Sequence, residues 1–250
     1  MSGYGPFAEV YDRLMYDADY PARFQFLKEL FLQYDRAPRL LLDLACGTGG
    51  FSTLFAADGT EVIGVDMSEE MLSVARENAA RQGVEVLFLC QQAQELDLYG
   101  TVDGAICCLD SLNHITDYHD LCRAIRQVAL FLEEGRLFIF DVNTVYKHLQ
   151  VLADNTFVWE EDGVYCVWQN ETDPQTLVTD ITLDFFVENN GLYTRGSEAF
   201  SERAYTEAEI ASALKQANLE IVAVLEDMRH STPRDTAERV IYVTRKEKTT

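Results

Sequence analysis

A group of small and acidic residues near the start of the chain has the types and spacing of a cofactor site. The apolar run LLLDL contains Asp43, and Ala45, Gly47 and Gly49 follow it directly. Glycines let a backbone approach a ligand without an intervening Cβ, and a helix beginning beyond them offers free N–H groups. Asp66 ends the next apolar run, at about the 20-residue distance where a carboxylate binds ribose hydroxyls in α/β folds. These residues predict a cofactor floor rather than a plain turn.

The glycine pattern argues against a dinucleotide. The dinucleotide fingerprint is Gly-x-Gly-x-x-Gly, whereas the stretch beginning at Gly47 has Ser52 in the last position. A nicotinamide oxidoreductase would use the same kind of sheet, but this spacing disfavours it. Met67 directly follows Asp66, and its flexible apolar side chain suits packing on an adenine face.

A second polar group follows the fourth apolar segment. Asp110, Asn113 and His114 come after the run VDGAICCL, and ligands of open α/β sheets bind at the carboxyl ends of the strands. We therefore expect Asp110 and His114 as catalytic candidates and Asn113 as a substrate contact. For Asp110, positioning a substrate is favoured over removing a proton, and for His114 a structural role is an equal alternative.

Cysteine and histidine spacing predicts no metal centre. The six cysteines contain no CxxC pair, and the four histidines lack metal-ligand spacing. Cys107 and Cys108 lie in an apolar segment and are interpreted as core thiols.

Alternating apolar and amphipathic segments predict the framework that positions these groups. The apolar segments are uniformly hydrophobic, which is typical of parallel strands covered by helices on both faces. The predicted fold class is therefore α/β: a Rossmann-like, seven-stranded, mostly parallel sheet with helices on both faces. The predicted strands cover 39–44, 60–65, 84–89, 102–109, 135–142, 219–226 and 239–244, and the predicted helices cover 50–58, 69–82, 117–132 and 207–217.

The pattern changes after the fifth strand, where alternating polar and apolar residues predict a small antiparallel meander. Glu161-Asp162-Gly163 and Asn189-Asn190-Gly191 have the composition of hairpin turns. We expect this meander to be an insertion over the active site. The predicted layout is a helical cap at 1–38, a cofactor-binding core at 39–150, the insertion at 151–205, and a helix with the last strands at 206–250.

The N-terminal segment is dense in aromatic residues, among them Tyr4, Tyr11 and Tyr16. They exceed what one buried helical stripe needs. Two interpretations stay open: a packed pair of helices, or a flap over the cofactor site.

The net charge bears on the class of partner. Among 250 residues, 42 are acidic and 20 are basic, so the formal net charge is −22. A surface of this charge repels phosphate backbones and anionic lipid. Nucleic acid is therefore a disfavoured partner. No apolar run approaches the roughly 20 residues that span a bilayer, and the first residues lack a signal-peptide pattern. We expect a cytoplasmic protein without membrane contact, and the sequence is silent on its oligomeric state.

Three motifs together resemble those of class I S-adenosylmethionine-dependent methyltransferases: LDLACGTG, VDMSEEML and GRLFIFDVNT. The aromatic segment Tyr4–Met15 and the stretch Asp110–Asn113 resemble, more narrowly, a group of uncharacterised Firmicutes methyltransferases. The inserted antiparallel strands belong to that group too.

The resemblance implies S-adenosylmethionine as cofactor and a role for each matching residue. Asp43 and the backbone from Ala45 to Gly49 would hold the methionyl part. Asp66 would bind the ribose. The resemblance further implies that Met67 flanks the adenine and that Gln91, Gln92 and Ala93 occupy the place of the family's usual acidic residue. It implies that Leu109 lines the junction with substrate and that Tyr11 closes over the methionine moiety. Tyr4 and Tyr16 would contact substrate.

Methyl transfer mainly requires alignment of the acceptor and exclusion of water. The Asn/Asp-Pro-Pro-Tyr motif of nucleic-acid amino methyltransferases is absent, and so is a Pro-Cys dipeptide. A small amine, hydroxyl or carboxyl compound is the expected acceptor. An RNA-modifying enzyme and a catalytically silent cofactor-binding protein are the alternatives.

Overall fold

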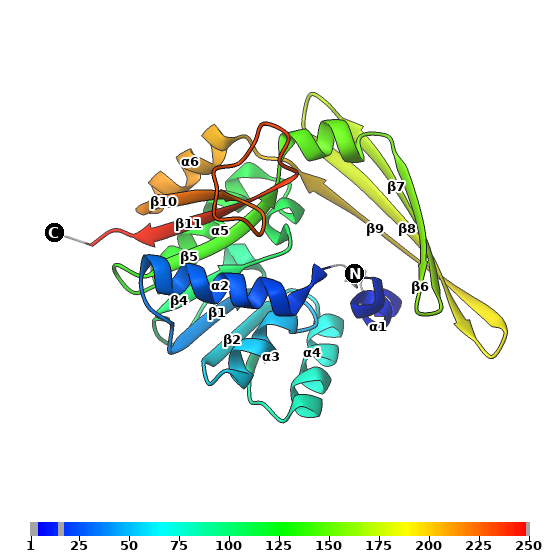
Figure 1. Cartoon of the computed structure of the whole chain (residues 1–250), viewed down its shortest axis with the longest axis horizontal. Coiled ribbons are helices and arrows are strands. Elements are labelled where there is room, and N and C mark those ends of the chain that lie inside the picture. The colour runs from blue at the N-terminus through cyan, green and yellow to red at the C-terminus, as the bar shows by residue number, and fades with distance from the viewer. Residues whose placement is uncertain (1–4, 15–17, 249–250) are drawn as a thin grey trace.

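A seven-stranded sheet forms the centre of the computed structural model, which describes residues 5–14 and 18–248 (Figure 1). Its strand order is β10-β11-β5-β4-β1-β2-β3, and only β11 runs antiparallel to its neighbours. This topology confirms the predicted fold class. The strands are β1 (Leu40–Leu44), β2 (Glu61–Asp66), β3 (Leu87–Cys90), β4 (Gly104–Cys107), β5 (Leu137–Asn143), β10 (Leu219–Glu226) and β11 (Arg239–Lys246).

The central strands β1, β4 and β5 are mostly apolar because both faces of the sheet are covered there. In β5, Phe138 and Phe140 contribute to one core and Ile139 to the other. Helices α5 and α6 cover the first face, and α2 and α3 cover the second. No helix in the described part of the chain is long and apolar enough to cross a membrane. The helices are α1 (Gly5–Leu14), α2 (Tyr20–Tyr34), α3 (Gly50–Ala57), α4 (Glu69–Gln82), α5 (Tyr118–Phe131) and α6 (Glu207–Gln216).

A separate four-stranded antiparallel sheet, in the order β6-β7-β8-β9, confirms the predicted meander. Asp162 and Gly163 have φ of 47° and 74°, and Asn190 and Gly191 have φ of 54° and 78°. Positive φ at both turn residues is the type I′ geometry that matches the twist of the flanking strands. The strands are β6 (Thr156–Glu161), β7 (Val164–Asp173), β8 (Val178–Asn189) and β9 (Leu192–Arg203), and a short π-helix, η4 (Lys147–Leu152), precedes them.

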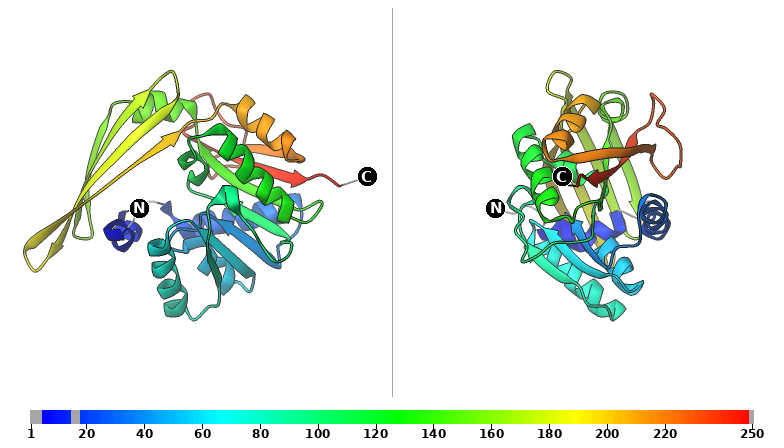
Figure 2. Two further views of the ribbon diagram at one scale, coloured as in Figure 1. Left: turned by 180° about the vertical axis from the view of Figure 1, so that it is seen from behind. Right: turned by 90° about the vertical axis from the view of Figure 1, so that its left-hand side faces the viewer.

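Helix α1 lies between the core and this second sheet (Figure 2). Its Ala8 and Leu14 are buried against α4 and the inner face of the four-stranded sheet. Asp12 of α1 accepts hydrogen bonds from Thr48 Oγ1 at 2.6 Å and from Asn78 Nδ2 at 3.2 Å. The N-terminal segment therefore has two parts: α2 belongs to the core layer, and α1 joins the two sheets.

The end of β4 differs from prediction. The strand covers Gly104–Cys107 instead of 102–109, because Leu109 and Asp110 adopt left-handed backbone with φ of 57° and 54°. The predicted helix at 69–82 has the expected ends. Local cap signals fixed that helix, whereas the turn after β4 depends on contacts with β5, described below.

We expect Gly104→Ala to destabilise the fold. A Cβ at position 104 would lie 2.8 Å from Pro38 Cβ and 3.2 Å from Phe31 Cε1. Overpacking of this kind costs about 1–3 kcal/mol, which urea denaturation would record as a lower midpoint at an unchanged slope. Gly100→Ala is the matched control, since a Cβ there meets nothing within 4 Å. Equal midpoints for the two variants would contradict this account.

Candidate active site

A pocket lies where the order of the parallel strands reverses. β1 and β4 are neighbours, but the chain proceeds from β1 to β2 on one side and from β4 to β5 on the other. Ligands of doubly wound sheets bind in the crevice that this reversal leaves at the carboxyl ends of the strands. Its empty volume, counted together with the open solvent at its mouth, is about 310 Å³. The pocket is lined by Tyr11, Tyr20, Asp43, Ala45, Cys46, Gly47, Phe51, Cys108, Leu109 and Ser111.

The turn after β1 is built from left-handed backbone. Ala45, Gly47 and Gly49 have φ of 56°, 54° and 77°. A Cβ at Gly47 would meet no atom within 4 Å, so the backbone there faces open space. A Cβ at Gly49 would lie 3.1 Å from Ala75 Cβ. Ala45 and Gly47 therefore line the pocket, while Gly49 allows α3 to begin close against α4.

Asp66 holds this turn from the neighbouring strand. Its carboxylate accepts hydrogen bonds from Gly47 N at 2.8 Å and from Ser68 N at 2.9 Å. The two bonds use one lone pair on each oxygen, and each carboxylate oxygen has two lone pairs. Asp66 thus keeps the capacity to accept two further donors, which fits a pair of ribose hydroxyls.

Asp43 is the buried acid of the pocket. It is 2% exposed, and its Oδ2 accepts a hydrogen bond from Ser52 Oγ at 2.5 Å. Burial raises the pKa of Asp43 to about 7, because the ionised form loses its hydration. A cation brought into this end of the pocket would stabilise the ionised carboxylate.

The predicted adenine contacts lie at the ends of β2 and β3. Met67 is 60% exposed, which leaves its side chain available to a ligand. Gln91 uses both atoms of its amide to bond the backbone of Asp97, so it shapes the loop after β3. Gln92 caps the short helix η2 (Ala93–Glu95), and Ala93 begins it.

Buried charges cluster beside the pocket. Asn143 Nδ2 donates to the carboxylates of both Asp110 and Glu202, the latter at 3.2 Å. Arg239 pairs with Asp110 at 3.1 Å. Burial opposes ionisation, but the charges of Arg239 and Lys147 hold the pKa of Asp110 below its ordinary value. The carboxylates of Asp110, which follows β4, and of Glu202, in β9, thus converge on one amide group.

Asp141 of β5 holds the turn that presents Asp110. The N–H groups of Leu109 and Asp110 donate to its two carboxylate oxygens at 2.8 Å and 2.7 Å. Arg239 Nε lies 3.6 Å from the same carboxylate. These contacts satisfy the backbone of two consecutive residues in a conformation that side-chain sterics disfavour.

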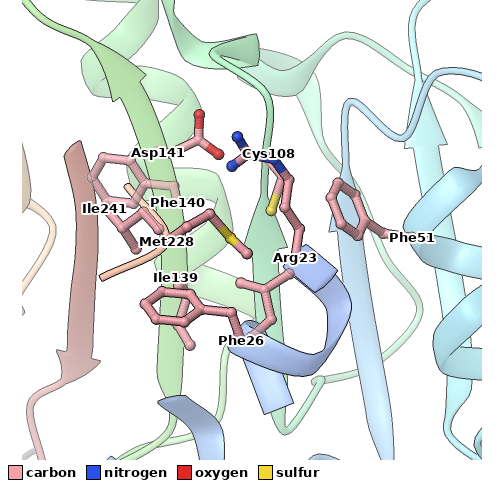
Figure 3. Close-up of a pocket in the computed structure, with 10 residues that line it drawn as sticks. Arg23, Phe26, Phe51, Cys108, Ile139, Phe140, Asp141, Met228 and Ile241 are labelled. Carbon is pink, nitrogen blue, oxygen red and sulfur yellow. The ribbon is translucent and has the colours of Figure 1, made fainter. Parts of the chain in front are cut away.

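A second cavity adjoins the pocket on the side of α2 (Figure 3). It has about 280 Å³ of empty volume and shares Phe51 and Cys108 with the first. Asp141 and the guanidinium of Arg23 lie at its polar end, and the remainder is mostly apolar. Asp227 binds that guanidinium through both oxygens, at 2.7 Å and 2.8 Å. The positive charge of Arg23 in this cavity is therefore balanced by an ion pair.

The remaining predicted substrate-side residues have different surroundings. The ring of His114 lies 5.0 Å from that of Phe200 in β9, and its Nε2 lies 3.7 Å from Glu202 Oε1. Tyr4 and Tyr16 fall outside the described residues.

Asn113 is fully buried. Its amide donates to the carbonyls of Asn143 and Arg203 at 3.2 Å and 2.8 Å, and accepts from Asn143 N at 2.9 Å. Asn113 thereby ties β5 to β9 across the two sheets.

Sequence reasoning missed residues that only tertiary packing brings to the site. Asn143 ends β5 just as Asp110 follows β4, so the strand-end rule could have identified it. Nothing local distinguishes Glu202, which sits in an alternating strand like many solvent-facing acids. Also missed were Tyr20, Cys46, Phe51, Cys108 and Ser111 in the pocket, and Lys147, His148 and Arg239 in the charged cluster.

The topology and the pocket at its switch point are those of doubly wound α/β proteins, which bind their ligands at this position. A methyltransferase domain family matches residues 41–135. YqeM of Bacillus subtilis, named as a methyltransferase, is 32% identical over 247 residues, or 98% of each chain. An S-adenosylmethionine-dependent methyltransferase from Clostridium acetobutylicum is 33% identical with a TM-score of 0.90, over 97% of this chain and 98% of that one. The sugar N-methyltransferase KedS8 from Streptoalloteichus shares the fold at 21% identity and a TM-score of 0.74, over 94% and 93% of the chains.

The chain therefore belongs to the class I S-adenosylmethionine-dependent methyltransferases, in the bacterial family that includes YqeM. Its cofactor is S-adenosylmethionine. The resemblance carried by the three sequence motifs is confirmed.

We expect Asp66→Ala to weaken binding of S-adenosylhomocysteine about 10- to 100-fold, since a charged hydrogen-bond partner of this kind contributes about 1–3 kcal/mol. The variant also releases the Gly47 and Ser68 N–H groups, so its melting temperature should fall. Isothermal titration calorimetry measures the affinity. Glu69→Ala removes an exposed acid three residues along the chain and should bind like the wild type. Wild-type affinity in Asp66→Ala would remove Asp66 from the cofactor site.

Proposed function

We propose that this enzyme methylates a small-molecule amine, with S-adenosylmethionine seated along the pocket at the switch point. Asp43 and the backbone from Ala45 to Gly49 hold the methionyl part, and Asp66 binds the ribose. The open backbone at Gly47 and the unused lone pairs of Asp66 support this placement. We further assign Met67, Gln92 and Ala93 to the adenine, Gln91 to the shape of its loop, and Tyr11 and Leu109 to the closure of the methionyl end.

The convergence of Asp110 and Glu202 carries the proposed acceptor class. Four carboxylates, those two, Asp141 and Asp227, face three cations, Arg239, Lys147 and Arg23, in this cluster. The surplus negative charge favours a protonated amine, which can donate to carboxylates through strong charged hydrogen bonds. The fold neighbour KedS8 acts on a sugar nitrogen, which supports the same class of acceptor atom here.

The inserted sheet supports a small acceptor over RNA. Glu202 and Phe200 come from β9, so this sheet forms one wall of the proposed acceptor site. The net charge of −22 repels a polyanion. We also place the enzyme in the cytoplasm, where reducing conditions suit its six free cysteines.

The chemistry requires an in-line displacement. The cofactor supplies a methyl group already activated by a sulfonium. The bound ammonium group must first give up one proton to a base; its nitrogen lone pair would then bond to the methyl carbon as the carbon–sulfur bond breaks and sulfur keeps the electron pair. The chain must align the nitrogen and exclude water.

We expect label from methyl-labelled S-adenosylmethionine to enter small amines but not RNA. The full chain would be incubated with a panel of amines that includes amino sugars, and in parallel with total RNA. Asp110→Asn should lower kcat/KM about 10- to 100-fold through loss of charged hydrogen bonds, and asparagine tolerates the left-handed backbone at this position. Asp120→Asn on the surface of α5 is the matched control. Label confined to RNA, or label in neither fraction, would overturn the proposed acceptor.

We also expect cofactor binding to release a proton near pH 6.5. The raised pKa of Asp43 means that the folded protein holds this proton more tightly than the unfolded chain, so the residue's contribution to stability declines from about pH 4 to pH 7. An ammonium group bound beside Asp43 favours the ionised form, so affinity for S-adenosylhomocysteine should increase as the pH rises towards 7. Calorimetry in two buffers of different ionisation enthalpy would count the protons. Asp43→Asn should abolish the release; a wild type without any release at pH 6.5 would show that no cation binds beside Asp43.

A further inference from the structure

Glu202 is a buried carboxylate whose oxygens face two imidazole rings. It is 3% exposed and lies near the end of β9. Oε1 is 3.7 Å from Nε2 of His114, and Oε2 is 3.8 Å from Nε2 of His148. A buried carboxylate needs compensating partners, and the two rings offer different ones, because His114 is partly exposed and His148 is fully buried.

The hydrogen bonds behind His148 determine which ring nitrogen carries the proton. Thr172 Oγ1 lies 2.9 Å from the carbonyl of Ala153, which can only accept, so the hydroxyl hydrogen of Thr172 points there. Thr179 must then donate to Thr172 across 2.8 Å. Having used its only hydrogen, Thr179 can only accept from His148 Nδ1, also at 2.8 Å. His148 therefore carries its proton on Nδ1, and its Nε2 is a bare lone pair.

That lone pair is buried and has no hydrogen-bond partner among the described residues. An ionised Glu202 sets a negative charge opposite the lone pair, whereas a protonated Glu202 that moves closer than the present 3.8 Å can donate a hydrogen bond to it. Burial and the charge of Asp110 raise the pKa of Glu202. Burial lowers the pKa of His148 to about 4. A proton that reaches this pair therefore stays on the carboxyl group and is stabilised by the neutral ring.

We propose that Glu202 is the general base of the methyl transfer, and that His148 is a positioning residue which accepts the hydrogen bond of the protonated carboxyl group. This inference rests on the proposed amine acceptor. The carboxylate of Glu202 takes one proton from the acceptor ammonium, and the freed nitrogen lone pair attacks the methyl carbon. The carbon–sulfur bond breaks with its electrons left on sulfur, and Glu202 later returns its proton to water.

Asp110 is poorly suited to be this base. It is paired with Arg239, and despite burial the nearby cations hold its pKa low. A carboxylate that resists protonation holds an ammonium group without removing its proton. Asp110 therefore orients the acceptor, and Glu202 deprotonates it.

The groups around Glu202 determine the direction of the pH dependence. Burial and Asp110 favour the protonated form, and His114, Lys147 and Asn143 oppose them; the net shift is upward. The remaining facing groups are His148 on η4 and Arg239 on β11. Because only the ionised form accepts a proton, kcat should increase with pH through the pKa of Glu202 and level off above it.

The tautomer of His148 tests the geometry without any acceptor. Nitrogen NMR of the full chain labelled with ¹⁵N-histidine, with His148→Asn to assign the signal, should show a neutral ring protonated on Nδ1 at pH 7. Substitution Glu202→Gln should move the Nε2 signal, because the amide can donate to it. A ring protonated on Nε2, or on both nitrogens, would overturn the positioning role.

The kinetic test uses an amine that the wild type methylates. Glu202→Gln should lower kcat about 100-fold or more, the usual contribution of general base catalysis, and should remove the acid limb of the pH profile. Its affinity for S-adenosylhomocysteine should stay unchanged. Asp180→Asn, which removes an exposed carboxylate from the neighbouring strand β8, is the matched control.

His148→Asn keeps a donor for Thr179 and removes the lone pair. The protonated form of Glu202 loses its acceptor, so the acid limb should move to lower pH while the fold is retained. This variant also decides the question if Glu202→Gln fails to fold. A wild-type rate in Glu202→Gln, or an acid limb that does not move in His148→Asn, would overturn this inference and leave the proposed function standing. If the wild type methylates no small amine, the proposed function fails and this inference fails with it.

Discussion

One carboxylate determines the shape of the substrate side of this enzyme. Asp141 accepts the backbone N–H groups of Leu109 and Asp110, and so holds two consecutive residues in left-handed backbone at the end of β4. The same carboxylate attracts Arg239, which also pairs with Asp110. The turn, the buried cation and the acceptor-side acid therefore form one connected unit.

The parts of the molecule that the sequence predicts well are those with local causes. The helix at 69–82 has a serine whose hydroxyl caps its first turn and a glycine in left-handed conformation at its end, and both signals can be read from neighbouring residues. The hairpin turns at Asp162-Gly163 and Asn190-Gly191 are equally local. The turn from Ala45 to Gly49 and the acid at the end of the next strand also occur within one βαβ unit.

The substrate side has no such local signal. Glu202 and His148 meet because a sheet inserted after β5 folds back across the core, and an acid in an alternating strand looks like a solvent-facing one. Asn113 shows the converse case: its position after β4 suggested a substrate contact, but its amide is occupied by the main chains of Asn143 and Arg203. The tautomer of His148 depends on Thr172 and Thr179, which no sequence spacing relates to it.

Helix α1 contacts both the glycine turn of the core and the inserted sheet. Through Asp12 it is bonded to Thr48 in the glycine turn, and through its apolar face it contacts the inserted sheet. Tyr11 of the same helix lines the cofactor pocket. With the cofactor placed as proposed, a movement of α1 would change both the cofactor pocket and the wall formed by the inserted sheet. Exchange of spent cofactor and reopening of the proposed acceptor site would then be coupled through this one helix.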